Sequence, residues 1–229
     1  MPYRPIFYDT ETTGTRPTQD KIIELAAYDP VLQKTFSQLI NPCCSIPEEA
    51  IKIHHITQDM VKDQPTFAEA IPSFLQFCEG EVVLIAHNND AFDLPFLQTE
   101  FLAANIPMPS WIFFDSLKWA RKYRSDLPRH TLQFLREAYH IEENGSHRAL
   151  NDVKILCQVF QHMIDDLSLE TVISLLVKED SIIKMPFGKY QGMAVTDIPK
   201  NYLDWLMKSG ALDKNHTLKT ALEKLGLLS

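Results

Sequence analysis

The sequence predicts an α/β protein in which helices cover both faces of one central sheet. Three apolar, strand-like segments come first along the chain and favour antiparallel neighbours, because short turns separate them. Strand-like and helix-like segments then alternate, as they do in α/β sheets. With 229 residues, 45% of them hydrophobic, the chain is long enough for one sizeable core and a small additional unit.

The expected strands are short runs of aliphatic and aromatic residues. They are residues 5–9, 22–29, 32–40, 81–88 and 111–115. The first and last of these end on the acids Asp9 and Asp115, and Asp29-Pro30 supplies a turn between the second and the third. The expected helices carry apolar residues at helical spacing. They are residues 66–80, 94–106, 116–123, 130–141 and 149–167, and residues 47–57 predict a short helix followed by a turn. Thr66 predicts an N-cap, because a glutamate follows three residues later.

The pattern changes after about residue 170. Residues 185–212 hold three of the seven glycines of the chain, and they alternate with short apolar stretches. We therefore expect a first domain over 1–168, a linking helix over 169–180, and a small, mainly helical module over 181–229.

The charge is unevenly distributed. The net charge of −8 excludes a protein that coats nucleic acid through overall positive charge. Residues 181–229 hold 7 lysines against 4 acids, so the negative charge belongs to the first domain, where divalent cations would offset it. The longest apolar runs are strand-sized, no leader segment is apparent, and the four cysteines show no metal-binding spacing. We expect a cytoplasmic protein with no membrane association.

Asp9 and Glu11 form the first candidate site. Residues two apart in a strand point to the same side, so both carboxylates can share one hard cation such as Mg²⁺ or Mn²⁺. Taken alone, the pair is equally typical of a strand-end turn, in which the threonines that follow form side-chain hydrogen bonds.

Two further acids and a histidine stand at the ends of expected elements. Asp93 follows the buried strand 81–88, where catalytic groups of α/β sheets collect, although an acid is also favoured in the first turn of a helix. His147 precedes the helix 149–167 and can take a proton from water near neutral pH. Asp152 lies in the first turn of that helix and can anchor a metal ion. Each of these residues alone has a common structural explanation. Their order and spacing along the chain together indicate a functional site.

These motifs resemble those of the DnaQ-like 3′–5′ exonucleases of the DEDDh type. That family carries Asp-x-Glu, then Asp, then His-x-Ala-x-x-Asp, which here are residues 9–11, Asp93 and residues 147–152. The related DEDDy type has tyrosine four residues before the last acid, where this chain has Arg148. The resemblance covers residues 4–166 and implies an RNase H-like fold, with a mixed five-stranded sheet flanked by helices.

The resemblance has two departures. The segment Ala86–Asp93 has one more residue between Asn88 and Phe92 than is typical of the bacterial proofreading subunit. This longer spacing is similar to that of three-prime repair exonucleases, which usually have tyrosine where Phe92 stands. His55 replaces the glycine of the hydrophobic-His-Gly-Ile-Thr segment, so the turn there is in question. Beyond the first domain, the sequence from Phe187 to Tyr190 resembles a small module that is found alone or fused to other proteins.

The resemblance implies a set of roles. Four acids would hold two Mg²⁺ ions, for which Mn²⁺ would substitute, and His147 would be the general base. These acids are Asp9, Glu11, Asp93 and Asp152. Thr10, Thr12 and His54 would hold the terminal nucleotide at the 3′ end of the substrate.

The expected activity is therefore the release of 5′-mononucleotides from nucleic-acid 3′ ends, with DNA preferred because of the repair-exonuclease spacing around Asp93. A 3′–5′ exoribonuclease of the same fold and a non-catalytic, polymerase-associated binding module are the alternatives. A second copy of the chain and replication or repair proteins are the candidate protein partners. For Tyr190, Tyr202 and Trp205 in the C-terminal module, a small hydrophobic core is preferred over nucleic-acid contact.

Overall fold

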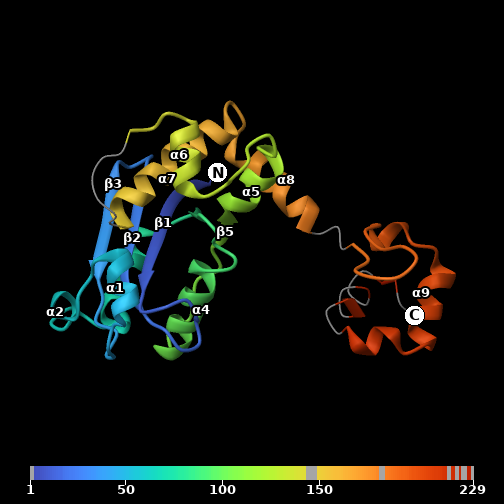
Figure 1. The fold of residues 1–229 in the computed structure, drawn as a ribbon, viewed down its shortest axis with the longest axis horizontal. Helices are drawn as coiled ribbons and strands as arrows, with labels where there is room; N and C mark the ends of the chain where they lie inside the picture. Colours follow the sequence, from blue (N-terminus) through green and yellow to red (C-terminus); the bar gives the residue numbers. More distant parts are fainter. Residues whose placement is uncertain are drawn as a thin grey trace. The chain divides into compact units, whose positions relative to one another are not determined.

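The computed structural model describes residues 3–142, 149–180, 184–215, 218–219, 222 and 226–227 (Figure 1). The chain divides into two compact units, Met1–Glu170 and Thr171–Ser229. The division falls inside helix α8 (Leu169–Asp180), in the region where the sequence predicts a linking helix.

The first unit is built on one mixed sheet of five strands, as the sequence predicts (Figure 1). The strands are β1 (Arg4–Thr12), β2 (Ile22–Asp29), β3 (Lys34–Leu39), β4 (Val82–Ala86) and β5 (Ile112–Asp115). Their order across the sheet is β3-β2-β1-β4-β5. The pairs β1–β2 and β2–β3 are antiparallel, whereas β1–β4 and β4–β5 are parallel.

Strand β1 is longer than the segment 5–9 that the sequence predicts. It continues to Thr12 because β2 goes on pairing with it, Glu11 with Glu24 and Thr12 with Ile22, across an irregularity between Glu11 and Thr12. Asp9 and Glu11 therefore both lie within the strand, and their side chains share one face of the sheet.

Seven helices precede α8 in the part of the first unit that the structure describes. They are α1 (Glu48–His54), α2 (Gln58–Val61), α3 (Phe67–Phe77), α4 (Asp93–Ala103), α5 (Ser116–Tyr123), α6 (Leu132–Ala138) and α7 (Ala149–Ile164). The capping interaction expected at Thr66 is present, since its N–H donates to Glu69 Oε2 over 2.8 Å. The short helix and turn expected over 47–57 are present, because His55 ends α1 in the left-handed backbone conformation, and α2 begins after them at Gln58.

Both faces of the sheet are covered, and the alternation of side chains along β1 explains how. Ile6 and Tyr8 belong to the core that α3 and α4 complete. Phe7 points to the opposite face, where its ring lies 5.5 Å from that of Phe160 on α7. Asp9 and Glu11 follow Phe7 at intervals of two residues, so their side chains point to the same face of the sheet, which α7 covers. The fold thereby brings the acids of β1 toward the start of α7.

Between residues 184 and 215, the second unit contains a short hairpin, closed by the bridge between Lys184 and Ala194, and three short helical segments. These are η1 (Val195–Asp197), α9 (Lys200–Lys208) and η2 (Ala211–Lys214). Its buried residues form a separate hydrophobic core that includes Met185, Leu203 and Leu206. Within the described residues, every helix is too short or too polar to cross a bilayer.

Candidate metal centre and nucleotide pocket

Three acids meet at one end of β1. Asp9 and Glu11 come from β1 and Asp152 from the first turn of α7, and each offers a carboxylate oxygen within 4.8 Å of the others. A strand and a helix start that are distant in sequence thus form one oxygen-rich group. Carboxylate oxygens at such separations are the ligands that Mg²⁺ and Mn²⁺ take in proteins.

Asp93 lies beside this group and is tied to β1. It is the first residue of α4 and is buried. The backbone N–H and the hydroxyl of Thr10 both donate to Asp93 Oδ1, over 3.1 and 2.8 Å. Thr10, between Asp9 and Glu11, thereby holds the Asp93 side chain near the three acids.

The four carboxyl groups strongly affect one another. Burial, and then the charges of Asp93, Glu11 and Asp152, raise the pKa of Asp9 well above its usual range. Burial, followed by the charges of Glu24 and Asp152, raises the pKa of Glu11 to about 7. Burial also raises the pKa of Asp93 to about 7, although the hydrogen bonds from Thr10 act in the opposite direction. Without a cation the anionic cluster is unfavourable, so the residues present fit a divalent metal.

Glu24 is a fifth acid near the site, and the sequence analysis did not identify it. It lies on β2, is only 1% exposed, and is the register partner of Glu11 on β1. Its charge raises the pKa values of both Asp9 and Glu11. The signal in the sequence is a single acid inside an otherwise apolar, strand-like run, which is unusual because an ionised carboxylate is costly to bury.

The loop that leads to Asp93 is held by Asp115 at the end of β5. Its Oδ1 accepts the N–H of Asn88 and its Oδ2 accepts the N–H of Asp90, each over 3.1 Å. Hydrogen bonds from two backbone groups to one carboxylate fix the path of the loop. The position of Asp93 thus depends on Asp115, an acid that the sequence places at a strand end without indicating a role.

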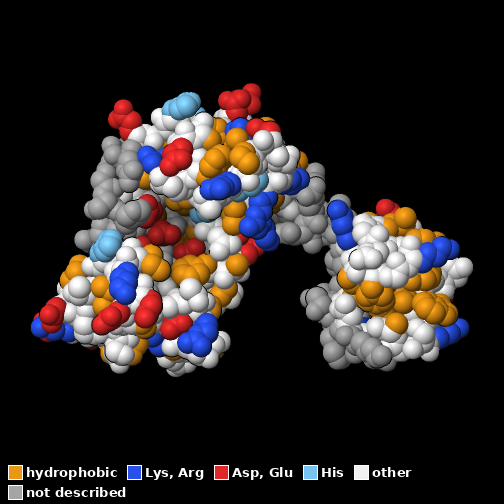
Figure 2. All heavy atoms as spheres, viewed as in Figure 1, with side chains coloured by type: hydrophobic (Ala, Val, Ile, Leu, Met, Phe, Trp, Pro, Cys, Tyr) orange, Lys and Arg blue, Asp and Glu red, His pale blue; other side chains and the backbone are white. Residues whose placement is uncertain are grey.

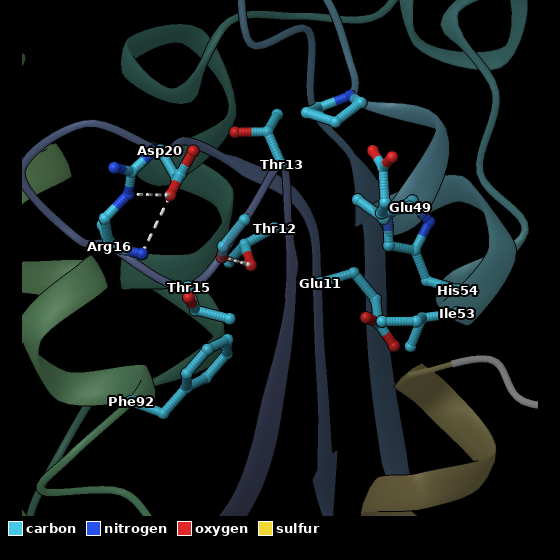
Figure 3. Close-up of a pocket in the computed structure, with 13 residues that line it drawn as sticks. Glu11, Thr12, Thr13, Thr15, Arg16, Asp20, Glu49, Ile53, His54 and Phe92 are labelled. Carbon is cyan, nitrogen blue, oxygen red and sulfur yellow. Dashed lines mark hydrogen bonds and ion pairs between the residues drawn. The ribbon is translucent and has the colours of Figure 1, made fainter.

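A cavity of about 470 Å³ adjoins the acids (Figure 3). Phe92 faces it from one side, and His54 and Ile53 lie on the other, with Glu11 between them. The residues that line it are Glu11, Thr12, Thr13, Gly14, Thr15, Arg16, Asp20, Pro47, Glu49, Ala50, Ile53, His54 and Phe92. Apolar walls beside an oxygen-rich cluster suit a flat base whose phosphate lies at the acids.

Of the residues expected to hold the nucleotide, Thr12 and His54 line the cavity, whereas Thr10 does not. His54 is 4% exposed, and its Nδ1 accepts the N–H of Ile56 over 3.0 Å. Burial lowers the pKa of His54, so the ring is neutral and carries its proton on Nε2. That nitrogen makes no hydrogen bond of ordinary geometry among the described residues, although the backbone of Thr12 lies near enough to oppose the lowering of the His54 pKa. A buried donor of this kind is costly to leave unsatisfied, which favours a role in binding.

Two further expectations concern histidines. His147 lies outside the described residues, so its role as a base stays a prediction. His55 keeps the turn that glycine would form, with φ of +60° and its N–H donating to Ile51 O over 2.8 Å. The substitution of glycine in this segment therefore leaves the turn geometry in place.

Comparison with known proteins agrees with this geometry. The family model described as "Exonuclease" matches residues 6–160, which include most of β1, Asp93, and the start of α7. The chain belongs to the DnaQ-like exonuclease family. A second family model, described as "Putative quorum-sensing-regulated virulence factor", matches residues 173–218 of the chain.

Two curated relatives give the extent of the similarity. The chain is 37% identical over 181 residues to the chloroplastic and mitochondrial exonuclease DPD1 of Arabidopsis thaliana. This alignment covers 72% of the chain and 57% of the relative. It is 36% identical over 162 residues to the DNA polymerase III subunit epsilon of Treponema pallidum, covering 69% of this chain and 74% of that subunit. The chain thus spans less than two thirds of the length of the Arabidopsis protein.

Solved structures of this fold are similar to the chain at lower identity. Exonuclease X in complex with 5′ overhanging duplex DNA aligns with a TM-score of 0.59 and 24% identity, covering 75% of this chain and 98% of that one. Exonuclease I of E. coli in complex with a dA16 oligonucleotide aligns with a TM-score of 0.63 and 21% identity, covering 80% and 46%. These likenesses show that the exonuclease-family chain has the RNase H-like fold.

Proposed function

We propose that the chain is a metal-dependent 3′–5′ exonuclease that releases 5′-mononucleotides from the 3′ ends of DNA. The observation that carries this proposal is the meeting of Asp9, Glu11 and Asp152 within 4.8 Å, beside a cavity of nucleotide size. Membership of the exonuclease family supports it.

Each residue of the site has a role in this proposal. Asp9, Glu11 and Asp152, together with the adjacent Asp93, would hold two Mg²⁺ ions, with Mn²⁺ as a substitute. When bound, these ions would lower the pKa of water and stabilise negative charge on the scissile phosphate. His147, which precedes α7 in the sequence, would accept the proton of the attacking water.

The chain's own residues position the substrate end. Thr12, His54 and Phe92 would hold the terminal nucleoside in the cavity, with His54 Nε2 as a hydrogen-bond donor. Thr10 contributes indirectly, because its two hydrogen bonds hold Asp93 in place. We place these functions in residues 1–168, with 169–180 as a link to a separate module over 181–229.

DNA is proposed over RNA for two reasons. The spacing around Asp93 resembles that of the repair exonucleases, and one relative is named as a subunit of a DNA polymerase. That relative also supports a replication or repair protein as a partner of this chain. A structural neighbour, the nuclease domain of 3′hExo, was solved bound to rAMP, so RNA belongs in the test.

The test uses matched DNA and RNA oligomers, labelled at the 5′ or the 3′ end, with Mg²⁺ or with a chelator. We expect Mg²⁺-dependent shortening of DNA from its 3′ end, loss of activity in Asp9→Asn, and normal activity in Asp59→Asn, which removes an exposed acid of α2. Shortening of RNA alone would replace the proposal by an exoribonuclease. The absence of any metal-dependent shortening would favour a non-catalytic binding module.

A further inference from the structure

Three aromatic rings form a row on the second unit. Tyr190 and Tyr202 meet edge to face with ring centroids 4.8 Å apart, and Tyr202 and Trp205 are stacked, 5.4 Å apart at 29°. Trp205 is 56% exposed, although it is the largest side chain of this unit. Figure 2 shows hydrophobic side chains gathered on this unit, with basic side chains at the edges of the patch.

The core of the unit does not require Trp205. On the same helix, α9, Leu203 and Leu206 are buried and supply the contacts with the rest of the core. An exposed tryptophan costs solubility and contributes little to folding when its neighbours already fill the core. Trp205 therefore belongs to the surface of the module, which differs from the small hydrophobic core preferred for it from the sequence, whereas Tyr190 and Tyr202 pack against that core as expected.

The position of the row is fixed by the loop before η1. The hydroxyl of Tyr202 accepts the N–H of Lys189 over 3.3 Å, which joins the loop to α9. Gly188 has φ of +79°, and a Cβ there would lie 2.5 Å from the Tyr202 hydroxyl oxygen. Glycine is thus needed for both backbone conformation and space. The motif that begins at Phe187 serves to hold Tyr190 against Tyr202.

Positive charge flanks the row at both ends. Lys189 Nζ lies 5.3 Å from the centroid of the Tyr190 ring. Lys208 is exposed and follows Trp205 by three residues on α9, so it lies one turn further along the helix. Residues 181–229 as a whole hold 7 lysines against 4 acids, in a chain of net charge −8. These lysines would gain nothing from an apolar protein partner, whereas they would attract the negatively charged phosphate backbone of a nucleic acid.

We propose that Tyr190, Tyr202 and Trp205 form a binding site for single-stranded nucleic acid. Bases would stack on the exposed indole and on the ring beside it, while Lys189 and Lys208 contact phosphates. A single strand is the fitting ligand, because base faces are hidden in a duplex. This site is separate from the metal centre of the first unit and does not depend on the exonuclease activity.

The test titrates the full chain in chelator with oligo(dT) or oligo(rU). It follows the tryptophan fluorescence of the wild type and, for the affinity of every variant, the fluorescence anisotropy of a dye on the oligomer. Trp205 is exposed, Trp119 is buried and Trp111 is partly buried, so quenching by an oligomer reports mainly on Trp205. We expect both oligomers to quench it, and Trp205→Ala to weaken binding about tenfold, while Trp205→Phe retains most of the affinity. Lys189→Ala and Lys208→Ala should each make the salt dependence less steep.

Two controls keep the result interpretable. Leu102→Ala removes an exposed apolar side chain from the first unit, so the affinity of this variant for the oligomers should be unchanged. Hydrolysis of the 4-nitrophenyl ester of thymidine 5′-phosphate, which needs only the metal centre, should be the same in Trp205→Ala and in the wild type. Unquenched fluorescence, or wild-type affinity in Trp205→Ala, would overturn the proposal. Self-association that Trp205→Ala abolishes, without quenching by oligomers, would show that a second copy covers the row instead.

Discussion

Glu11 on β1 and Glu24 on β2 are register partners across an antiparallel strand pair, so two carboxylates stand opposite each other beside the metal centre. Like charges in directly opposed positions destabilise a sheet. The charge of Glu24 is the largest influence on the pKa of Glu11 after burial. The same two charges attract a divalent cation, so the arrangement favours metal binding and disfavours the metal-free protein.

The metal-free protein should therefore lose stability as pH rises. The pKa values of Glu11 and Asp93 in the folded state are about 7, above the values near 4 of unfolded acids. Between pH 4 and 7 the folded state binds more protons, so the free energy of unfolding decreases across that window and levels off above it. Thermal melts in chelator at pH 5, 6 and 7.5 should show a decreasing Tm that Mg²⁺ restores.

Glu11→Gln should make this pH dependence less steep and raise the Tm in chelator at pH 7.5 by roughly 2–4 °C. The control is Asp59→Asn, which removes an exposed acid together with its ion pair to Lys62 and so tests the loss of a negative charge away from the site. An equal change in both variants would mean that overall charge, and not the opposed pair, causes the pH dependence.

Thr10→Val should impair activity without weakening nucleotide binding in the cavity. The substitution keeps the backbone N–H bond to Asp93 but removes the hydroxyl donor, so the carboxylate is harder to ionise. We expect kcat at pH 7 to decrease about tenfold and the acid limb of the pH profile to move to higher pH, with little change in KM. Thr99→Val, which removes a hydroxyl on α4 that bonds only to a backbone carbonyl, should leave the profile unchanged.

The elements that the sequence predicts correctly are those with a strong local pattern. The aliphatic runs of β2 and β4 and the acid at the start of α4 follow from residue type and spacing alone. Where long-range pairing decides, the sequence prediction is incomplete. Strand β1 extends to Thr12 because β2 continues opposite it, and the place of Glu24 depends on the same register.

The site shows the same division. The three acids are brought together as their spacing suggests, because strand alternation and a helix start are local features. The cavity could not be predicted, since Phe92 precedes α4 whereas Glu49 and Ile53 lie on α1, and these two elements meet only in the fold. Thr10 is a similar case: its neighbours suggest substrate contact, and only the structure shows that Asp93 takes both of its donors.

Ile53→Ala should weaken substrate binding without affecting the fold. Ile53 is 73% exposed at the edge of the cavity, so little packing is lost on its removal. If the terminal base lies between Ile53 and Phe92, KM for a short oligomer should rise about threefold to tenfold, at unchanged kcat and Tm. Leu102→Ala, an exposed apolar side chain remote from the cavity lining, should change neither constant.

His147→Ala should decrease turnover by roughly a hundredfold or more while leaving metal binding intact. The reason is that a base accepts a proton from water, whereas the carboxylates hold the ions. Mn²⁺ binding, followed by electron paramagnetic resonance, should match the wild type. Near-normal turnover would remove His147 from its role, and loss of Mn²⁺ binding would make it a ligand instead.

His55→Gly should stabilise the protein slightly and leave activity unchanged. His55 has φ of +60°, a conformation that costs a residue with a side chain roughly 1 kcal/mol and glycine almost nothing. Its imidazole is exposed and does not line the cavity, so nothing else is lost. We expect Tm to rise by about 2 °C in His55→Gly and to decrease in His55→Val, whose branched side chain fits this conformation poorly. Lys52→Gly, in the right-handed part of α1, should lower Tm, and a decrease in both glycine variants would show that His55 is not strained.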